Sequence, residues 1–437
     1  MIRSTSAVPG PAPAVLDSVV EILDPSDLEP SRDDRVLNRA GFRKSAMRRI
    51  LLPFFTTLLA LCPLSLWAEQ NYFPPRHTWQ TLAPEPAGFD PARLQTAIEF
   101  ARAAAVTEPK DLHQVITESF APREPDFRIL GPTAPREADA GIILRHGRIV
   151  AEWGDVHRVD MTFSAVKSYL ATVWALAWRD GRIESLDDRV ARYVSDGTFA
   201  GEHNAAINWR HLLNQTSDWS GTLWQIPDWA DRPEGEDPQQ WPQRVLHEPG
   251  SRFKYNDVRV NLTAYSLLQV LREPLPVVLR REIMDPIGAS NSWRWHGYAN
   301  SWVELDGLRI QSVSGGGHFG GGLFISARDH ARFGLLMLRR GHWEDRQLLP
   351  EAWFDLLRQP TPVQRDYGLM WWLNTERQRV PAAPESAYWA AGFGGNYVYI
   401  DECNDLVVVL RWIPDLAGVI EKLLGAMEKT KTCQKTA

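Results

Sequence analysis

The chain has 437 residues, of which 44% are hydrophobic, 23% charged and 10% aromatic. This composition excludes long disordered, collagen-like and coiled-coil chains, and the length is sufficient for a large core. A formal net charge of −6 provides no basic surplus for nucleic acid, and three cysteines are too few for a zinc ribbon or a disulfide scaffold. Lysine is scarce among the 48 basic residues, so a lysine inside a motif is informative.

Residues 47–68 have the pattern of a signal peptide. Arg48 and Arg49 precede an apolar run from Ile50 to Leu66, and Ala68 offers a small residue for cleavage. We therefore expect a periplasmic or secreted protein. The alternative is an uncleaved inner-membrane anchor, because about 17 apolar residues can just span a bilayer.

The segment before this pattern, residues 1–46, is rich in Pro, Ser, Asp and Arg and has no sustained period. We expect it to be a non-native upstream extension, with the true start at Met47, or a disordered extension. Residues 69–437 then form the functional domain. Export would permit a disulfide between Cys403 and Cys433, but the sequence leaves this pairing open.

In the first half of that domain, the hydrophobic pattern predicts a helix at 91–105 and a loop at 122–140. Alternating apolar residues from Gly141 to Trp153, around His146-Gly147, predict a β-hairpin. An apolar stripe at helical spacing predicts a helix from Ser164 to Arg179.

The middle, from about 185 to 310, is expected to be mostly short helices and loops with many tryptophans. A glycine-dense loop from Gly315 to Gly322 precedes a predicted helix through Phe333 and Leu338. The C-terminal part predicts strands and then a last helix: Tyr367 to Leu373, Trp389 to Ile400, Leu406 to Trp412, and Leu416 to Lys429. This order indicates an α/β (α+β) fold with one antiparallel sheet supplied by both ends of the chain.

The strongest chemical motif is Ser164-Ala-Val-Lys167. A serine and a lysine three residues apart at the start of a helix share one face, and the helix N-terminus favours an oxyanion. A buried lysine can exist as a neutral amine that accepts the serine proton. Ser251-Arg-Phe-Lys254 also matches S-x-x-K, but no helix follows it.

Several other catalytic motifs are missing from the chain. It contains no G-x-S-x-G elbow, no H-E-x-x-H and no glycine-rich loop that ends in Gly-Lys-Ser/Thr. Metal-dependent hydrolysis and nucleotide chemistry therefore have no local support. We expect neither a metal nor another cofactor.

Two further blocks follow the Ser164 motif in order. They are Pro249-Gly-Ser-Arg-Phe-Lys-Tyr-Asn-Asp257 and Trp389-Ala-Ala-Gly-Phe-Gly-Gly-Asn396. Together the three blocks resemble the serine β-lactamase and penicillin-binding-protein superfamily, in particular its class C-like esterase and amidase branch. Within that branch the chain is most similar to 6-aminohexanoate-dimer hydrolases, over roughly residues 90–425.

This resemblance implies a β-lactamase/transpeptidase-like fold, with an antiparallel sheet flanked by helices and an additional helical region. It makes Ser164 the nucleophile and Lys167 its base, and makes Tyr255 a hydroxyl that relays protons to the leaving group and later from water. The implied oxyanion hole is formed by the N–H groups of Ser164 and of Phe393, which follows Gly392.

The chain departs from the family pattern at two positions. The second motif usually ends in Asn, where this chain has Asp257; a carboxylate there would favour the charged form of the Lys167 amine. The third motif usually opens with Lys or His, where this chain has Ala390. An alanine cannot hold the carboxylate of a β-lactam or peptide terminus, so we expect a substrate without that group.

Two further features could belong to the site. His318, inside the glycine-dense loop, could line the pocket or be a solvated loop residue. Trp219, Trp224 and Trp229 could form a wall of the cleft or simply pack in the core.

The resulting hypothesis is a serine hydrolase of a small-molecule ester or short amide. It would bind no nucleic acid and would contact a membrane only through an uncleaved N-terminal segment. One alternative is a penicillin-binding D-Ala-D-Ala carboxypeptidase or a class C-like β-lactamase. A second is an inactive ligand-binding homologue in which Asp257 has disabled the base.

Overall fold

The computed structural model describes residues 72–124, 126–235 and 237–428. The expected upstream extension at 1–46, the expected signal peptide at 47–68 and Cys433 lie outside these ranges. No helix within them is both long and apolar enough to cross a bilayer.

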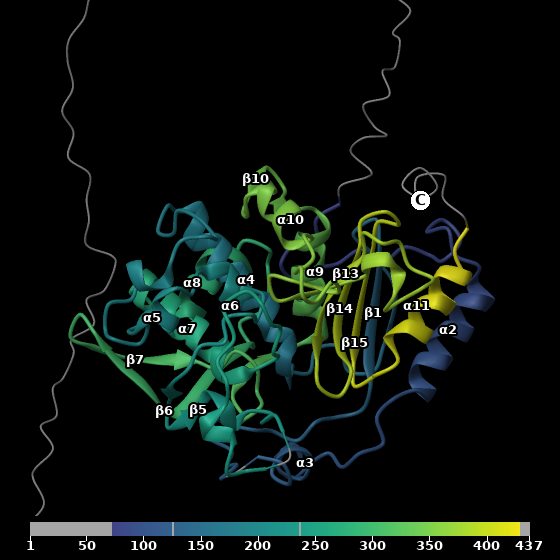
Figure 1. The fold of residues 1–437 in the computed structure, drawn as a ribbon. Helices are drawn as coiled ribbons and strands as arrows, with labels where there is room; N and C mark the ends of the chain where they lie inside the picture. Colours follow the sequence, from purple (N-terminus) through teal and green to yellow (C-terminus); the bar gives the residue numbers. More distant parts are fainter. Residues whose placement is uncertain (1–71, 125, 236, 429–437) are drawn as a thin grey trace, which may run out of the picture. The chain divides into compact units, whose positions relative to one another are not determined.

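Both ends of the domain contribute to a seven-stranded antiparallel sheet (Figure 1), in the order β11-β12-β13-β14-β15-β1-β2. The predicted N-terminal hairpin is confirmed as β1 (Ala140–Arg145) and β2 (Arg148–Trp153), joined by His146 and Gly147 at φ 54° and 74°. The C-terminal strands are β11 (Tyr367–Gly368), β12 (Trp371–Leu373), β13 (Tyr388–Gly392), β14 (Asn396–Asp401) and β15 (Leu406–Arg411). The prediction of an antiparallel sheet supplied by both ends is confirmed.

Two of the segments expected to be single strands are hairpins. The first is divided into β11 and β12 by Leu369 and Met370, whose φ angles are 43° and 66°. The second is divided into β13 and β14 by the three residues from Phe393 to Gly395. Both arms of each hairpin are apolar, so hydrophobic alternation alone did not locate the tight turns.

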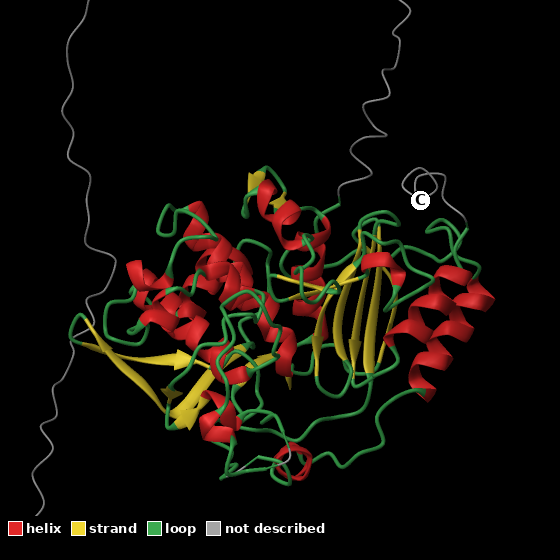
Figure 2. Cartoon of the chain, viewed as in Figure 1, coloured by secondary structure: helices red, strands yellow, loops and turns green. Residues whose placement is uncertain are grey.

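Helices cover both faces of this sheet (Figure 2). The helices α2 (Pro91–Ala103) and α11 (Leu416–Gly425) pack on one face, where Val408 and Leu410 of β15 enter the core. The helices α4 (Val166–Arg179) and α9 (Ala327–Leu338) pack on the other, where Val407 and Val409 point. Because both faces are buried, β15 is apolar from Leu406 to Leu410 instead of alternating with polar residues.

A second, four-stranded sheet was not predicted. Its order is β3-β8-β6-β7, and its two long strands are β6 (Arg294–Leu305) and β7 (Leu308–Val313). The expectation of mostly short helices and loops is therefore wrong for the end of the 185–310 segment. The pairing of β6 with β7 shifts register between Gly297 and Trp302, and this irregularity interrupts the period-two pattern.

The helical region beside the sheets contains α5 (Glu202–Ala205), α6 (Trp209–Leu213), α7 (Asp257–Leu271) and α8 (Leu275–Leu279). The long helix α7 packs against α4, and this contact brings the second motif to the first. The remaining helices and strands are short: α3 (Leu112–Phe120), α10 (Glu351–Leu357), β3 (Asp160–Met161), β4 (Thr222–Leu223), β5 (Ile226–Pro227), β8 (Gly322–Ile325), β9 (His342–Trp343) and β10 (Arg346–Gln347).

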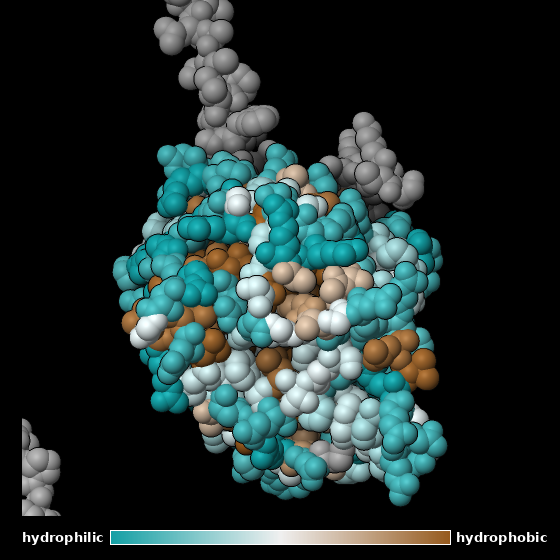
Figure 3. Space-filling model, turned by 60° about the vertical axis from the view of Figure 1, so that its left-hand side comes forward, coloured by the Kyte–Doolittle hydropathy of each residue, from teal (hydrophilic) through white to brown (hydrophobic). Residues whose placement is uncertain are grey.

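Most of the surface in view in Figure 3 is hydrophilic, and its hydrophobic residues lie in separate small groups. Isolated exposed apolar side chains are normal on a globular protein. Phe393 is one of the exposed large apolar residues, at 40% relative exposure, and it belongs to the third motif.

Candidate active site

Ser164 lies in a single 3-10 turn, Phe163–Ala165, that leads directly into α4. The preceding residue, Phe163, has φ 48°, a left-handed conformation that is unfavourable for an aromatic residue. Its buried ring packs 5.2 Å from the ring of Phe393. The turn presents Ser164 at the positive end of a buried helix, where developing negative charge is stabilised.

Lys167 follows one turn later and is buried, at 1% relative exposure. Its Nζ donates a hydrogen bond to Ser164 Oγ over 2.9 Å and another to Asp257 Oδ1 over 2.6 Å. The same Nζ lies 4.7 Å from the centre of the Tyr255 ring. Lys167 is therefore the point at which the first and second motifs meet.

Asp257 is the first residue of α7 and is also buried. Burial by itself would raise the pKa of its carboxyl group, but Lys167 and Arg232 outweigh that effect and hold the pKa well below its usual range. The carboxylate accepts a hydrogen bond from the backbone N–H of His318 over 3.3 Å. A Cβ on Gly316 would lie 2.0 Å from Asp257 Oδ2, so the glycine-dense loop can pass close to this carboxylate.

A buried cluster of Glu124, Asp231 and His318 lies behind Asp257. Their potential ligand atoms are within 4.8 Å of one another, a spacing that could accommodate a metal ion. The cluster already has internal partners, because His318 Nε2 lies 2.7 Å from Glu124 Oε2 and Asp231 accepts from the Asp257 N–H. These contacts hold Asp257 in position without requiring an ion.

Tyr255 is half-buried and faces the same space as Ser164. Its ring lies 6.0 Å from that of Trp372, with an interplanar angle of 25°. Among the described residues, none forms a hydrogen bond with its hydroxyl group. The hydroxyl of Tyr255 is thus available to a substrate.

The end of β13 lies directly against the Ser164 turn. A Cβ on Gly392 would lie 2.1 Å from the carbonyl oxygen of Thr162 and 3.2 Å from Ala165 N, so this close approach requires glycine. Phe393 comes just after the last β13–β14 pair, Gly392–Asn396. Its carbonyl accepts a hydrogen bond from the Asn396 side chain over 2.7 Å, which fixes the orientation of this turn.

An open pocket of about 460 Å³ lies in front of Ser164. Four of the residues expected in the site line it: Ser164, Tyr255, Gly392 and Phe393. Asp257 and His318 do not; they lie buried behind it, and His318 is neither a pocket residue nor a solvated loop residue.

The rest of the pocket wall includes residues that were not expected in the site. Its further aromatic residues are Trp389, which opens the third motif, and Trp372 and Tyr397, which belong to no motif. The expected tryptophans lie elsewhere: none lines this pocket, and Trp229 lines a neighbouring cavity of about 440 Å³. Two arginines, Arg232 and Arg379, also line the pocket, and neither belongs to a motif that would have revealed it.

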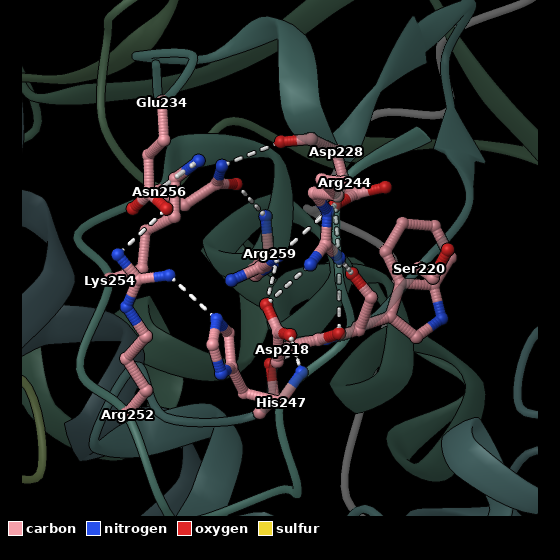
Figure 4. A network of polar contacts seen from close by, with 12 residues as sticks. Asp218, Ser220, Asp228, Glu234, Arg244, His247, Arg252, Lys254, Asn256 and Arg259 are labelled. Carbon is pink, nitrogen blue, oxygen red and sulfur yellow. Dashed lines mark hydrogen bonds and ion pairs between the residues drawn. The ribbon is translucent and has the colours of Figure 1, made fainter. Parts of the chain in front are cut away.

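The segment that carries Tyr255 is held by a buried polar network (Figure 4). The guanidinium of Arg259 donates to Asp218 over 2.8 Å and to Asp228 over 3.1 Å, and Arg244 also contacts both carboxylates. The backbone carbonyl of Asp228 in turn accepts from the Asn256 side chain over 2.7 Å. This network couples the loop at 218–232 to the start of α7.

The second S-x-x-K sequence has no such setting. Ser251 is exposed in a turn, and its hydroxyl donates to the backbone carbonyl of Glu248 over 2.7 Å. Lys254 Nζ lies 4.0 Å from Glu234 Oε1, and within the described part of the chain no hydrogen bond joins its side chain to Ser251. The helix after the first serine therefore distinguishes the two matches.

A family model described as Beta-lactamase matches residues 140–411. A family VIII carboxylesterase of known structure has a TM-score of 0.51 and 14% identity, covering 78% of this chain and 98% of its own. A beta-lactamase/D-alanine carboxypeptidase from Pseudomonas syringae has a TM-score of 0.49 and 15% identity, and the match covers 77% of this chain and 99% of that protein. A protein described as a 6-aminohexanoate-dimer hydrolase from Bacillus anthracis has a TM-score of 0.44 and 14% identity, and the match covers 84% of this chain and 96% of that protein. No curated protein matches the chain.

Proposed function

Because the chain belongs to the beta-lactamase family, within the superfamily of serine β-lactamases and penicillin-binding proteins, we propose that it hydrolyses an ester or a short amide through an acyl-enzyme on Ser164. The observation that carries this proposal is the 2.9 Å contact between Lys167 Nζ and Ser164 Oγ at the wall of an open pocket. A base within hydrogen-bond distance is what a serine needs to become a nucleophile.

In the proposed acylation, Lys167 in its neutral form takes the proton from Ser164 Oγ as that oxygen bonds to the substrate's carbonyl carbon. The carbonyl π electrons move to the oxygen, which the N–H groups of Ser164 and Phe393 stabilise. The tetrahedral state then collapses, the bond to the leaving group breaks, and the proton passes through the Tyr255 hydroxyl to that group. Water repeats the sequence on the acyl-enzyme and regenerates Ser164.

The test treats the full chain with a fluorophosphonate probe and measures intact mass. We expect one adduct on the wild type, formed as Ser164 Oγ displaces fluoride, and none on Ser164→Ala. The matched control is Ser251→Ala, which removes the serine of the second S-x-x-K sequence and should label like the wild type. An adduct that survives on Ser164→Ala would overturn the assignment.

A second candidate function follows from the Asp257–Lys167 contact of 2.6 Å. That carboxylate competes with Ser164 Oγ for the Lys167 amine, and an amine committed to Asp257 leaves Ser164 without a base. In that case the protein would be an inactive ligand-binding homologue. It would remain unlabelled by the probe while Asp257→Asn gained labelling at neutral pH.

A further inference from the structure

The charged side chains that line the pocket in front of Ser164 are all positive. Arg232 and Arg379 line it together with several aromatic residues, whereas no aspartate or glutamate does. Each arginine has a carboxylate partner, Asp231 and Asp366 respectively, but neither partner lines the pocket. The positive charges therefore face the substrate space, and the compensating negative charges lie outside it.

Arg232 uses only part of its hydrogen-bonding capacity. Its Nη1 donates to the buried Asp231, and no described residue accepts a hydrogen bond from its Nε or Nη2. The side chain is 35% exposed, which leaves these donors accessible. The Arg232 Cζ lies 5.6 Å from the centre of the Phe120 ring and 5.5 Å from that of the Tyr255 ring, so two aromatic rings contact the guanidinium and orient it.

Arg379 is arranged in a similar way. Its Nε donates to Asp366, and among the described residues none accepts from its Nη1 or Nη2. Its guanidinium lies 4.7 Å from the ring of Trp372, and the side chain is 47% exposed. A guanidinium that is already oriented loses less conformational entropy when it binds an oxyanion.

The two arginines belong to one continuous wall. Arg232 lies over Tyr255, Tyr255 stacks with Trp372 at 6.0 Å, and Trp372 contacts Arg379. Ser164 lines the same pocket as all four. A substrate bound at Ser164 in this pocket therefore shares it with two guanidinium groups that have unused donors.

We propose that the pocket selects acyl substrates that carry a carboxylate, and that Arg232 and Arg379 are the residues that recognise it. This inference rests on the proposed hydrolase function and names its substrate class. Ala390, which lacks the cation of the family's third motif, is fully buried and does not line the pocket. The proposed carboxylate site is therefore the Arg232–Arg379 wall, and the proposal differs from the sequence expectation of a substrate without this group, which stays a prediction.

The experiment compares the 7-hydroxycoumarin monoester of adipic acid, which has a free carboxylate, with the methyl ester of the same compound. For the wild type we expect kcat/KM to be higher for the carboxylate form by about tenfold or more, as charge-assisted hydrogen bonds to a guanidinium predict. Arg379→Gln should lower this ratio by about fivefold or more, mainly through KM. Added NaCl should also lower it, because the ions screen a partly exposed charge.

The control is Arg377→Gln, which removes an equal charge from an exposed neighbour that does not line the pocket. It should leave the ratio unchanged. Arg232→Lys retains the positive charge beside the buried Asp231, which Arg232→Gln would remove. It loses the planar guanidinium with its paired donors, and should therefore lower the ratio. A wild-type ratio of one or less, or a ratio that Arg379→Gln does not change, would overturn the inference.

Calorimetric titration of Ser164→Ala with the same two esters separates this inference from the proposed function. Selective binding of the carboxylate form supports the Arg232–Arg379 wall even if the wild type hydrolyses neither ester. Hydrolysis of both esters without selective binding supports the hydrolase and refutes the wall.

Discussion

Lys167 and Asp257, ninety positions apart in the chain, form a buried ion pair with 2.6 Å between Nζ and Oδ1. The pair exists because α7 packs against α4 and because Asn256 caps α7, its side chain accepting from Arg259 N over 2.9 Å. The only other hydrogen-bond partner of Lys167 Nζ within the described ranges is Ser164. In the proposed mechanism, this one amine therefore decides whether Ser164 is activated.

Asp257→Asn should raise the rate of acylation at neutral pH. The substitution removes the buried carboxylate that competes with Ser164 Oγ for Lys167 Nζ, at 2.6 Å against 2.9 Å. The pKa of the Asp257 carboxyl is well below its usual range, so in the wild type this competitor is a carboxylate throughout the neutral range. The rate of fluorophosphonate labelling of the two proteins at pH 7 tests the increase, and a slower variant would contradict it.

The same depressed pKa has a consequence for stability. A carboxyl whose folded-state pKa lies below its unfolded value stabilises the fold fully above the unfolded pKa, about 3.9, and loses that contribution as the pH falls further. The stability advantage of the wild type over Asp257→Asn should therefore decrease as the pH falls below about 4. A difference that does not decrease there would contradict this assignment.

Gly392→Ala should inactivate the enzyme. The new Cβ would meet the backbone of Thr162 at 2.1 Å, and backbone atoms cannot rotate away, so β13 must move from the Ser164 turn. Because Phe393 follows immediately, we expect kcat/KM to fall by about 100-fold or more, as for the loss of an oxyanion-hole donor.

The matched control for that substitution is Gly425→Ala at the end of α11. No atom lies within 4 Å of the position its Cβ would take. Steady-state ester hydrolysis and thermal melting should both remain at wild-type values. If Gly392→Ala were as active as this control, the proposed contact between β13 and the Ser164 turn would be wrong.

Arg259→Gln should destabilise the fold by roughly 3 to 5 kcal/mol, because it leaves the buried carboxylates of Asp218 and Asp228 without one of their cations. Both partners lie within 3.1 Å of its Nη2. Arg272→Gln at the other end of α7 provides the comparison, since both Arg272 and its partner Asp306 are exposed and a solvent-screened pair contributes little to stability. Urea unfolding of both variants measures the difference, and equal losses would refute a structural role for the network.

His211 predicts a loss of stability in mild acid. Burial lowers the pKa of its imidazole to about 4, and its Nδ1 accepts a hydrogen bond from Asn208 N, which requires the neutral ring. The unfolded chain, with a histidine pKa near 6.5, binds more protons below that pH, so stability should fall between about pH 6.5 and 4. Solvent screening of the partly exposed ring limits the loss to about 1 to 2 kcal/mol.

His211→Asn tests this directly. The asparagine side chain retains an acceptor oxygen but has no titrating group. The free energy of unfolding should therefore become less dependent on pH between 4 and 6.5 than it is in the wild type. An unchanged pH dependence would assign the acid sensitivity to other groups.

The sequence alone determined the local parts of this protein. Alternation around His146 predicts the first hairpin, and helical spacing after Ser164 places Lys167 one turn from it, because both patterns depend only on neighbouring residues. The order of the three motifs also indicated the superfamily, and the family match over residues 140–411 confirms it. The tight turns within the C-terminal strands and the bulged strand β6 were not predicted, because their patterns do not follow a regular period.

Only the tertiary structure decided which distant side chains meet. His318 entered the sequence analysis as a pocket candidate, yet its loop folds behind Asp257, where its ring lies within 2.7 Å of Glu124. Arg232 and Arg379 belong to no motif, and they line one pocket because two loops, separated by more than a hundred residues, end beside the same sheet. The local pattern of residues determines helices, strands and the spacing of a motif. The charge of the pocket depends on contacts between distant segments, and no short segment of the sequence reveals which segments will meet.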